Sequence, residues 1–295
     1  MSDHVDVRVA GGLLATYRLG ASGPGAPLVL AIHGITSTSR TWLAVARALD
    51  DRAALLAVDL RGRGRSSGLP GPCGLDVHVR DMIAVLDDAG LERAVVVGHS
   101  LGAYIASRLA TRHSDRVSRL VLVDGGLSIP ESEGADPDEF IARFLGPTFE
   151  RLAMTFTDVA AYQDWWARHP AVANADVERS DLDAYAAHDL VGTPPRLHSG
   201  ITAEVVRDDG LDLFGDPDAL RLDVPALFLA APRGMVDDPN PMQPLTDVQA
   251  WAAEDPDRRR AVLVPDTNHY SIAWGARGAR AVADAIADAA AAAAD

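Results

Sequence analysis

Ser100 has the residue type and the neighbours of a catalytic nucleophile. It stands in the pentapeptide Gly98-His99-Ser100-Leu101-Gly102, directly after the apolar run 94–97. Such a run is typical of a buried strand, and the apolar residues after the pentapeptide recur at helical spacing. The two glycines allow a sharp turn that exposes the hydroxyl where the strand becomes a helix. The pattern predicts attack by this hydroxyl on a carbonyl carbon, with the N–H of Leu101 facing the oxyanion.

His269 is the histidine whose position best suits a general base. It lies in segment 265–270, which leaves the last apolar run of the chain as a loop. Such a loop can bring the imidazole to Ser100. The imidazole can then take the serine proton and give it to the leaving group. His99 lies inside the pentapeptide and is expected to point away from the nucleophile. Six others fall in expected helices, in an inserted segment or near the terminus: His4, His78, His113, His169, His188 and His198.

Other motifs occur in the order of a known family. His33-Gly34 follows an early apolar run, the turn 59–66 (DLRGRGRS) follows the next, and Asn268-His269 comes near the end. With the Ser100 pentapeptide between them, nearly the whole chain resembles the α/β-hydrolase family. The resemblance implies the α/β-hydrolase fold, a mostly parallel eight-stranded sheet covered by helices, and a triad in the order Ser, acid, His. It also implies that Ile35, the residue after His-Gly, supplies the second oxyanion N–H.

Two of these motifs are interpreted as structural. We expect His33 to be a buried histidine whose ring is hydrogen-bonded to backbone, not a catalytic group. The three arginines of turn 59–66 could form an anion site. We favour an Asp/Arg network that braces the loop beside the nucleophile, because the matching family turn has no known chemistry of its own.

The acid of the triad has two candidates. In the family's usual arrangement the seventh strand ends in Gly-x-x-Asp, but this chain has Gly234 where the aspartate is expected. Asp237 and Asp238 follow three and four residues later. Asp124 comes after the sixth strand, where some family members, including certain lactonases and dehalogenases, carry their acid. We favour Asp124, because it follows a buried strand next to the strand that precedes Ser100, and such a strand can hold it rigidly. Asp237 needs a longer loop to reach His269.

The order of the elements predicts an α/β core with an insertion. A hairpin is expected over 5–9 and 14–18, a terminal helix from about 276, and buried strands over 28–32, 54–58, 94–97, 117–123, 224–231 and 261–264. Residues 1–126 and 223–295 form the expected core, and residues 127–222 form a helical cap without strand signals. Nine of the sixteen aromatic residues lie in that cap, which favours a lid over an apolar pocket: Phe140, Phe144, Phe149, Phe156, Tyr162, Trp165, Trp166, Tyr185 and Phe214.

Composition narrows the possible partners and cofactors. The chain has 295 residues, 48% of them hydrophobic, and a net charge of −15. This charge disfavours nucleic acid and anionic membranes as partners. All the basic residues are arginines, which excludes Schiff-base chemistry and a Ser/Lys dyad, and the single Cys73 excludes a disulfide within the chain. We therefore expect a small-molecule substrate, no cofactor and no metal. The N-terminus has no pattern of a secretory signal, so we expect the protein in the cytoplasm.

These observations predict a lidded serine hydrolase. Ser100, His269 and Asp124 would cleave an uncharged carboxylic ester or lactone through an acyl-enzyme, with Ile35 and Leu101 as oxyanion donors. A thioesterase or amidase on the same fold is an alternative. A ligand-binding member that has lost its chemistry is another. The sequence does not specify the oligomeric state.

Overall fold

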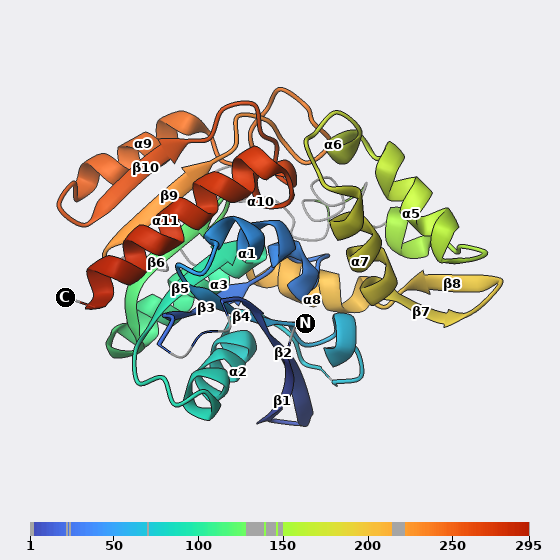
Figure 1. Cartoon of the computed structure of the whole chain (residues 1–295), viewed down its shortest axis with the longest axis horizontal. Coiled ribbons are helices and arrows are strands. Elements are labelled where there is room, and N and C mark those ends of the chain that lie inside the picture. The colour runs from blue at the N-terminus through green and yellow to red at the C-terminus, as the bar shows by residue number, and fades with distance from the viewer. Residues whose placement is uncertain are drawn as a thin grey trace.

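An eight-stranded sheet forms the centre of the molecule, described here from a computed structural model (Figure 1). The structure describes residues 3–21, 23, 25–69, 71–127, 139, 146, 150–213 and 222–294. In spatial order the strands are β1 (Asp3–Val9), β2 (Gly12–Gly20), β4 (Ala54–Val58), β3 (Leu28–Ile32), β5 (Ala94–His99), β6 (Val117–Val123), β9 (Ala226–Ala230) and β10 (Arg259–Leu263). Strand β2 is antiparallel to both of its neighbours, β1 and β4, and the other neighbouring strands pair in parallel. The hairpin that the sequence predicts therefore forms an antiparallel edge of the sheet. The α/β-hydrolase fold is confirmed.

Helices cover both faces of the sheet. Helices α2 (Leu75–Asp88), α3 (Leu101–Arg112) and α9 (Leu245–Glu254) bury apolar side chains on one face. Helices α1 (Leu43–Leu49) and α11 (Ala276–Ala294) bury theirs on the other, and Figure 1 shows α11 lying along the sheet. Because both faces are covered, the central strands read as continuous apolar runs. Among the described residues, none of the helices is both long and apolar enough to cross a membrane.

The segment between β6 and β9 contains a hairpin as well as helices. Its described elements are α5 (Val159–Arg168), α6 (Pro170–Ala173), α7 (Arg179–Asp189), β7 (Leu190–Thr193), β8 (Arg196–Ser199) and α8 (Ala203–Asp212). The expectation of a segment without strands was wrong. Each strand has only four residues, too few to give a recognisable alternation in the sequence. Parts of 127–222 lie outside the described residues, so the exact division into core and cap stays a prediction.

The aromatic residues of this segment form a small core of their own. Tyr162, Trp166 and Tyr185 are buried, and the ring of Trp166 packs 5.1 Å from that of Trp274 in α10 (Ser271–Trp274). This packing joins the inserted segment to the C-terminal part of the sheet domain. Four of the nine aromatic residues noted in the sequence lie outside the described residues: Phe140, Phe144, Phe149 and Phe214.

Two glycines allow α3 to pack directly against the central strands. A Cβ atom at Gly98 would lie 2.1 Å from the carbonyl oxygen of Gly102. A Cβ atom at Gly102 would lie 2.0 Å from the carbonyl oxygen of Ile32 at the end of β3. Both distances are far below van der Waals contact, and both obstacles are backbone atoms. The steric role expected of the two glycines is confirmed.

Two fully enclosed histidines lie beside this crossing. The ring of His33 contacts the carbonyl oxygen of Gly34 at 2.7 Å and accepts the N–H of Leu60 at 3.0 Å, so the expected structural role of His33 is confirmed. The Nε2 atom of His99 lies 2.8 Å from the carbonyl oxygen of His269. Burial lowers the pKa of His33 to about 4 and that of His99 to about 3. Both rings are therefore neutral in the folded protein near neutral pH.

Replacement of Gly102 by alanine should destabilise the fold. The added methyl group would meet the Ile32 carbonyl, and overpacking of this kind costs about 1–3 kcal/mol or more. Gly68→Ala is the matched control, because a Cβ atom there meets nothing within 4 Å. Urea unfolding should show a large loss for Gly102→Ala and a change within about 0.5 kcal/mol for Gly68→Ala. Equal stability of the two variants would contradict the steric account.

Folding stability should fall on mild acidification. The unfolded chain protonates His33 and His99 near pH 6.5, whereas the folded protein resists protonation until about pH 4 and about pH 3. The stability present above pH 6.5 is therefore lost as the pH falls, by up to about 1.4 kcal/mol per pH unit for each histidine. Urea unfolding between pH 7 and pH 5 measures this slope, and His99→Gln should make it shallower. A flat profile across this range would contradict the prediction.

Candidate active site

Ser100 occupies the turn between β5 and α3 in a strained backbone conformation. Its φ is 54° and its ψ is −123°, and a positive φ is uncommon for a residue with a side chain. Conformations of this kind cost about 1–3 kcal/mol and persist only where the surroundings impose them. Here the N–H of Ser100 is hydrogen-bonded to Val123 of β6 at 3.0 Å, and α3 begins at Leu101. The turn therefore has the form of a nucleophile elbow.

The structure brings Asp124 and His269 together. The Nδ1 atom of His269 lies 2.7 Å from Oδ2 of Asp124, and both side chains are almost fully buried. The second carboxylate oxygen of Asp124 accepts the N–H of Ala231 at 3.0 Å. Asp124 follows β6 and Ala231 follows β9, so two neighbouring parallel strands hold the carboxylate. A carboxylate fixed in this way can orient an imidazole.

Asp237, the other candidate acid, has different partners. Its Oδ1 atom accepts the side-chain amide of Asn268 at 3.0 Å and lies 2.9 Å from Nε of Arg233. Asp237 thus braces the residue before His269, while Asp124 contacts the imidazole itself. The loop between β10 and α10 is also held by the contact of His99 with the His269 carbonyl oxygen.

One pocket is lined by the three residues predicted for the triad and by the two predicted oxyanion donors. Ser100, His269, Asp124, Ile35 and Leu101 all line it, and its empty volume is about 660 Å³, including solvent at its mouth. Among the described residues that line it there is no arginine, and Asp124 is the only carboxylate. The remaining apolar part of the wall consists of Leu213, Met235, Met242, Tyr270 and Trp274. Such a wall suits an uncharged, largely apolar ligand.

The loop of Ile35 is held through its carbonyl groups. The Thr36 carbonyl accepts hydrogen bonds from Arg151 at 2.9 Å and from Tyr185 at 3.0 Å, both in the inserted segment. The N–H groups of Ile35 and Leu101 have no hydrogen-bond acceptor among the residues that the structure describes. Both residues line the pocket, so these two donors are available to a ligand there.

The turn 59–66 is a structural network, as favoured from the sequence. Asp59 accepts the backbone N–H groups of Ser39 and Arg65, and its carboxylate also contacts the side chains of Tyr17 and of His188, which lies 2.7 Å away in α7. Burial alone would raise the pKa of Asp59, but the contact with His188 and these hydrogen bonds bring it down to about 2. The contact of His188 with Asp59 was not predicted from the sequence. The residues of α7 show no hydrophobic pattern that would distinguish His188 from a histidine on the surface.

One group of side chains within the described residues has the composition of a metal site. The ligand atoms of Cys73, His78 and Asp209 lie within 4.8 Å of one another. Both oxygens of Asp209 are already engaged, one by Arg63 at 2.6 Å and the other by His78 at 3.0 Å. Burial raises the pKa of Cys73 to about 11, which disfavours the thiolate that a metal needs. These residues fit an ion-pair network better than a metal ion.

Comparison with known proteins agrees with the fold described above. A family model described as the alpha/beta hydrolase fold matches residues 27–276. A putative carbamate hydrolase, RutD, from Caulobacter segnis is 29% identical over 86% of this chain and 85% of its own length. Lipase LipV from Mycobacterium tuberculosis is 34% identical over 61% of this chain and 63% of its own length.

Solved structures show the same fold at low identity. E-2-(acetamidomethylene)succinate hydrolase superposes with a TM-score of 0.77 at 22% identity, covering 98% of each chain. The thioesterase domain from the curacin biosynthetic pathway gives a TM-score of 0.76 at 19% identity, covering 97% of this chain and 99% of that one. The family match spans most of the sequence and the described sheet has the corresponding strand order, so this chain belongs to the alpha/beta hydrolase family.

Proposed function

We propose that this protein is a serine hydrolase that works through an acyl-enzyme on Ser100. The observation that carries the proposal is the 2.7 Å contact between His269 and Asp124, which line the same pocket as the strained Ser100 turn. A nucleophile, a base and an orienting acid from three parts of the chain thus converge on one cavity.

The proposed reaction has two halves. The Asp124 carboxylate accepts the Nδ1–H of His269, which leaves Nε2 free to take the proton of Ser100 as its oxygen attacks the substrate carbonyl. The tetrahedral intermediate collapses, His269 gives that proton to the leaving group, and an ester forms on Ser100. Water then attacks this ester with His269 again as the base, which releases the acid and restores the serine.

The oxyanion of each tetrahedral intermediate needs hydrogen-bond donors. We assign this role to the N–H groups of Ile35 and Leu101, because both residues line the same pocket as Ser100. Leu101 is also the first residue of α3, where the helix dipole favours negative charge. Removal of one such donor typically costs about 10²–10³ in kcat.

The preferred substrate is an uncharged carboxylic ester or lactone with an apolar acyl part. The apolar wall, in which no arginine occurs among the described residues, supports this choice. Leu213, directly after α8, contributes to the wall, so the inserted segment serves as a cap over the substrate. Carbamates and thioesters are alternative substrates, as the names of two similar proteins suggest, and amides are an alternative because the same triad chemistry can cleave them. Matched p-nitrophenyl esters, thioesters and anilides of one acyl group would rank these classes.

Ser100→Ala should abolish turnover without unfolding the protein. The hydroxyl is the attacking group, and loss of a triad nucleophile removes about four or more orders of magnitude of kcat. With p-nitrophenyl butyrate, the native protein should show a burst of one nitrophenol per Ser100, and the variant should show none. If a correctly folded Ser100→Ala variant kept its activity, the mechanism would be wrong. If no member of the panel reacted with the native protein, a ligand-binding role would replace the hydrolase.

Asp124→Asn and Asp237→Asn should separate the two candidate acids. An asparagine at 124 stabilises the wrong tautomer of His269, which should lower kcat by about 10⁴. An asparagine at 237 retains an oxygen for the amide of Asn268 and should change kcat less than ten-fold. Steady-state kinetics with thermal melts of both variants measure the difference. If Asp237→Asn lowers kcat far more than Asp124→Asn does, the assignment of Asp124 as the triad acid is wrong.

A further inference from the structure

The loop that carries the proposed oxyanion donor Ile35 is held by contacts to three successive carbonyl oxygens. The Gly34 carbonyl lies 2.7 Å from Nδ1 of His33, and the Thr36 carbonyl is held from the inserted segment. Between them, the Ile35 carbonyl accepts two hydrogen bonds from Arg63, from Nε at 3.1 Å and from Nη2 at 2.9 Å. His33 therefore fixes the peptide plane before Ile35, and Arg63 fixes the one after it. The Ile35 N–H belongs to the plane that His33 contacts, and Arg63 fixes the next plane and with it the position of the Ile35 Cα atom that the two planes share.

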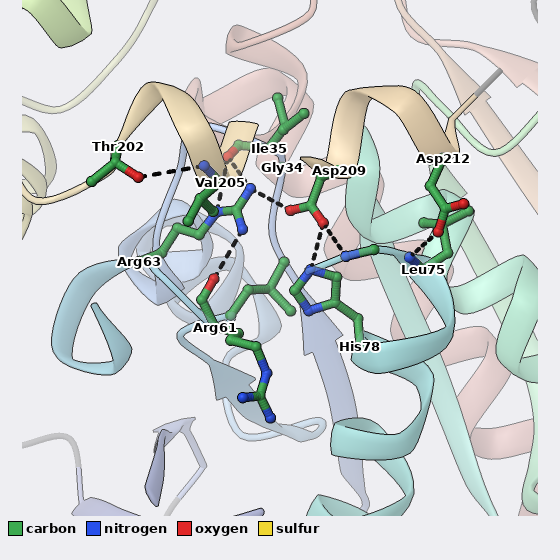
Figure 2. A network of polar contacts seen from close by, with 12 residues as sticks. Gly34, Ile35, Arg61, Arg63, Leu75, His78, Thr202, Val205, Asp209 and Asp212 are labelled. Atoms are coloured by element: carbon green, nitrogen blue, oxygen red, sulfur yellow. Dashed lines mark hydrogen bonds and ion pairs between the residues drawn. The ribbon is translucent and has the colours of Figure 1, made fainter. Parts of the chain in front are cut away.

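Arg63 uses all three guanidinium nitrogens at this position, as Figure 2 shows. Besides its bonds to Ile35, it donates from Nη1 to the Arg61 carbonyl at 2.9 Å. Its Nη2 atom lies 2.6 Å from Oδ2 of Asp209, and neither side chain has any exposed surface. A buried guanidinium requires a counter-charge, because removing one partner of such a pair leaves an uncompensated charge. Asp209 supplies it from α8.

Asp209 fixes α8 to the sheet domain at several points. Its Oδ1 atom accepts the N–H of Gly74 at 2.7 Å and lies 3.0 Å from Nε2 of His78. One turn earlier on α8, Val205 packs against Gly62, where a Cβ atom would lie 2.8 Å from the valine side chain. Figure 2 shows α8 lying across the turn with Asp209 directed at Arg63. The helix next to the pocket residue Leu213 is thus fixed to the turn that holds the oxyanion loop.

We infer that Arg63 is a positioning residue for catalysis, which aligns the Ile35 N–H with the oxyanion and is itself held by Asp209 of the cap. This inference rests on the proposed function. Both hydrogen bonds from Arg63 to Ile35 end on the carbonyl oxygen, and Arg63 is not among the described residues that line the pocket. Its effect should therefore appear in the rate of acylation, and binding of the uncharged ester should be nearly unchanged.

Arg63→Lys and Arg61→Lys provide a matched test. A lysine keeps the charge but cannot reproduce the planar fork that reaches Ile35, Arg61 and Asp209 together. Arg61 is also buried, and among the described residues its guanidinium pairs with Asp81 and donates to the Ala10 carbonyl, away from Ile35. With p-nitrophenyl butyrate, Arg63→Lys should lower kcat about ten-fold or more with KM within two-fold, and Arg61→Lys should leave both nearly unchanged. Equal kinetic effects in the two variants would overturn the inference.

A second measurement does not depend on activity. Amide hydrogen exchange of the peptide covering 33–38 should be faster in Arg63→Lys than in the native protein, and unchanged in Arg61→Lys. Unaltered exchange in Arg63→Lys would also overturn the inference. If Arg63→Lys does not fold, Asp209→Asn takes its place, because it removes the counter-charge at nearly constant shape, and the same readouts apply. An inactive native protein would refute the proposed function, and the exchange data would still decide whether Arg63 orders the loop.

Discussion

The crossing of β5 and α3 is the steric constraint on which the site depends. Gly98 and Gly102 let the helix start against backbone atoms of the neighbouring strand, at distances that no side chain permits. Ser100 is consequently forced to a φ of 54° between two elements that cannot move apart. The same crossing places Leu101, the first residue of α3, among the residues that line the pocket. A single packing requirement thus positions both the hydroxyl and one proposed oxyanion donor.

Buried charge connects the inserted segment to this scaffold. Asp59 contacts His188 of α7, Arg63 is paired with Asp209 of α8, and Arg151 of the insertion holds the Thr36 carbonyl. Each contact joins the inserted segment to the sheet domain. All three involve either turn 59–66 or the loop that carries Ile35, the proposed oxyanion donor. Apolar packing could join the two parts equally well, but it would not fix the orientation of the backbone groups in the loop. Charge-assisted hydrogen bonds are directional, and direction is what an oxyanion donor requires.

The sequence predicted the features that depend on neighbouring residues. Ser100 and its two glycines are recognisable because strand, turn and helix follow one another directly, and the fold followed from the order of such motifs. The choice between Asp124 and Asp237 could not be made so clearly, because it depends on which loop reaches His269, 145 residues away from Asp124. The structure places Asp124 against the imidazole, as favoured, while its catalytic role stays a proposal. The pairing of Arg63 with Asp209 was not predictable, since α8 has the polar pattern of an ordinary surface helix.

The most direct test of the account is a crystal structure of the protein with Ser100 trapped by an alkyl phosphonate, which mimics the tetrahedral intermediate. The account predicts a phosphonyl oxygen within hydrogen-bonding distance of both Ile35 N and Leu101 N, with His269 still bonded to Asp124 and the alkyl chain against Met235, Met242 and Trp274. A phosphonyl oxygen directed away from those two N–H groups would contradict it. So would a phosphonate attached to any residue other than Ser100.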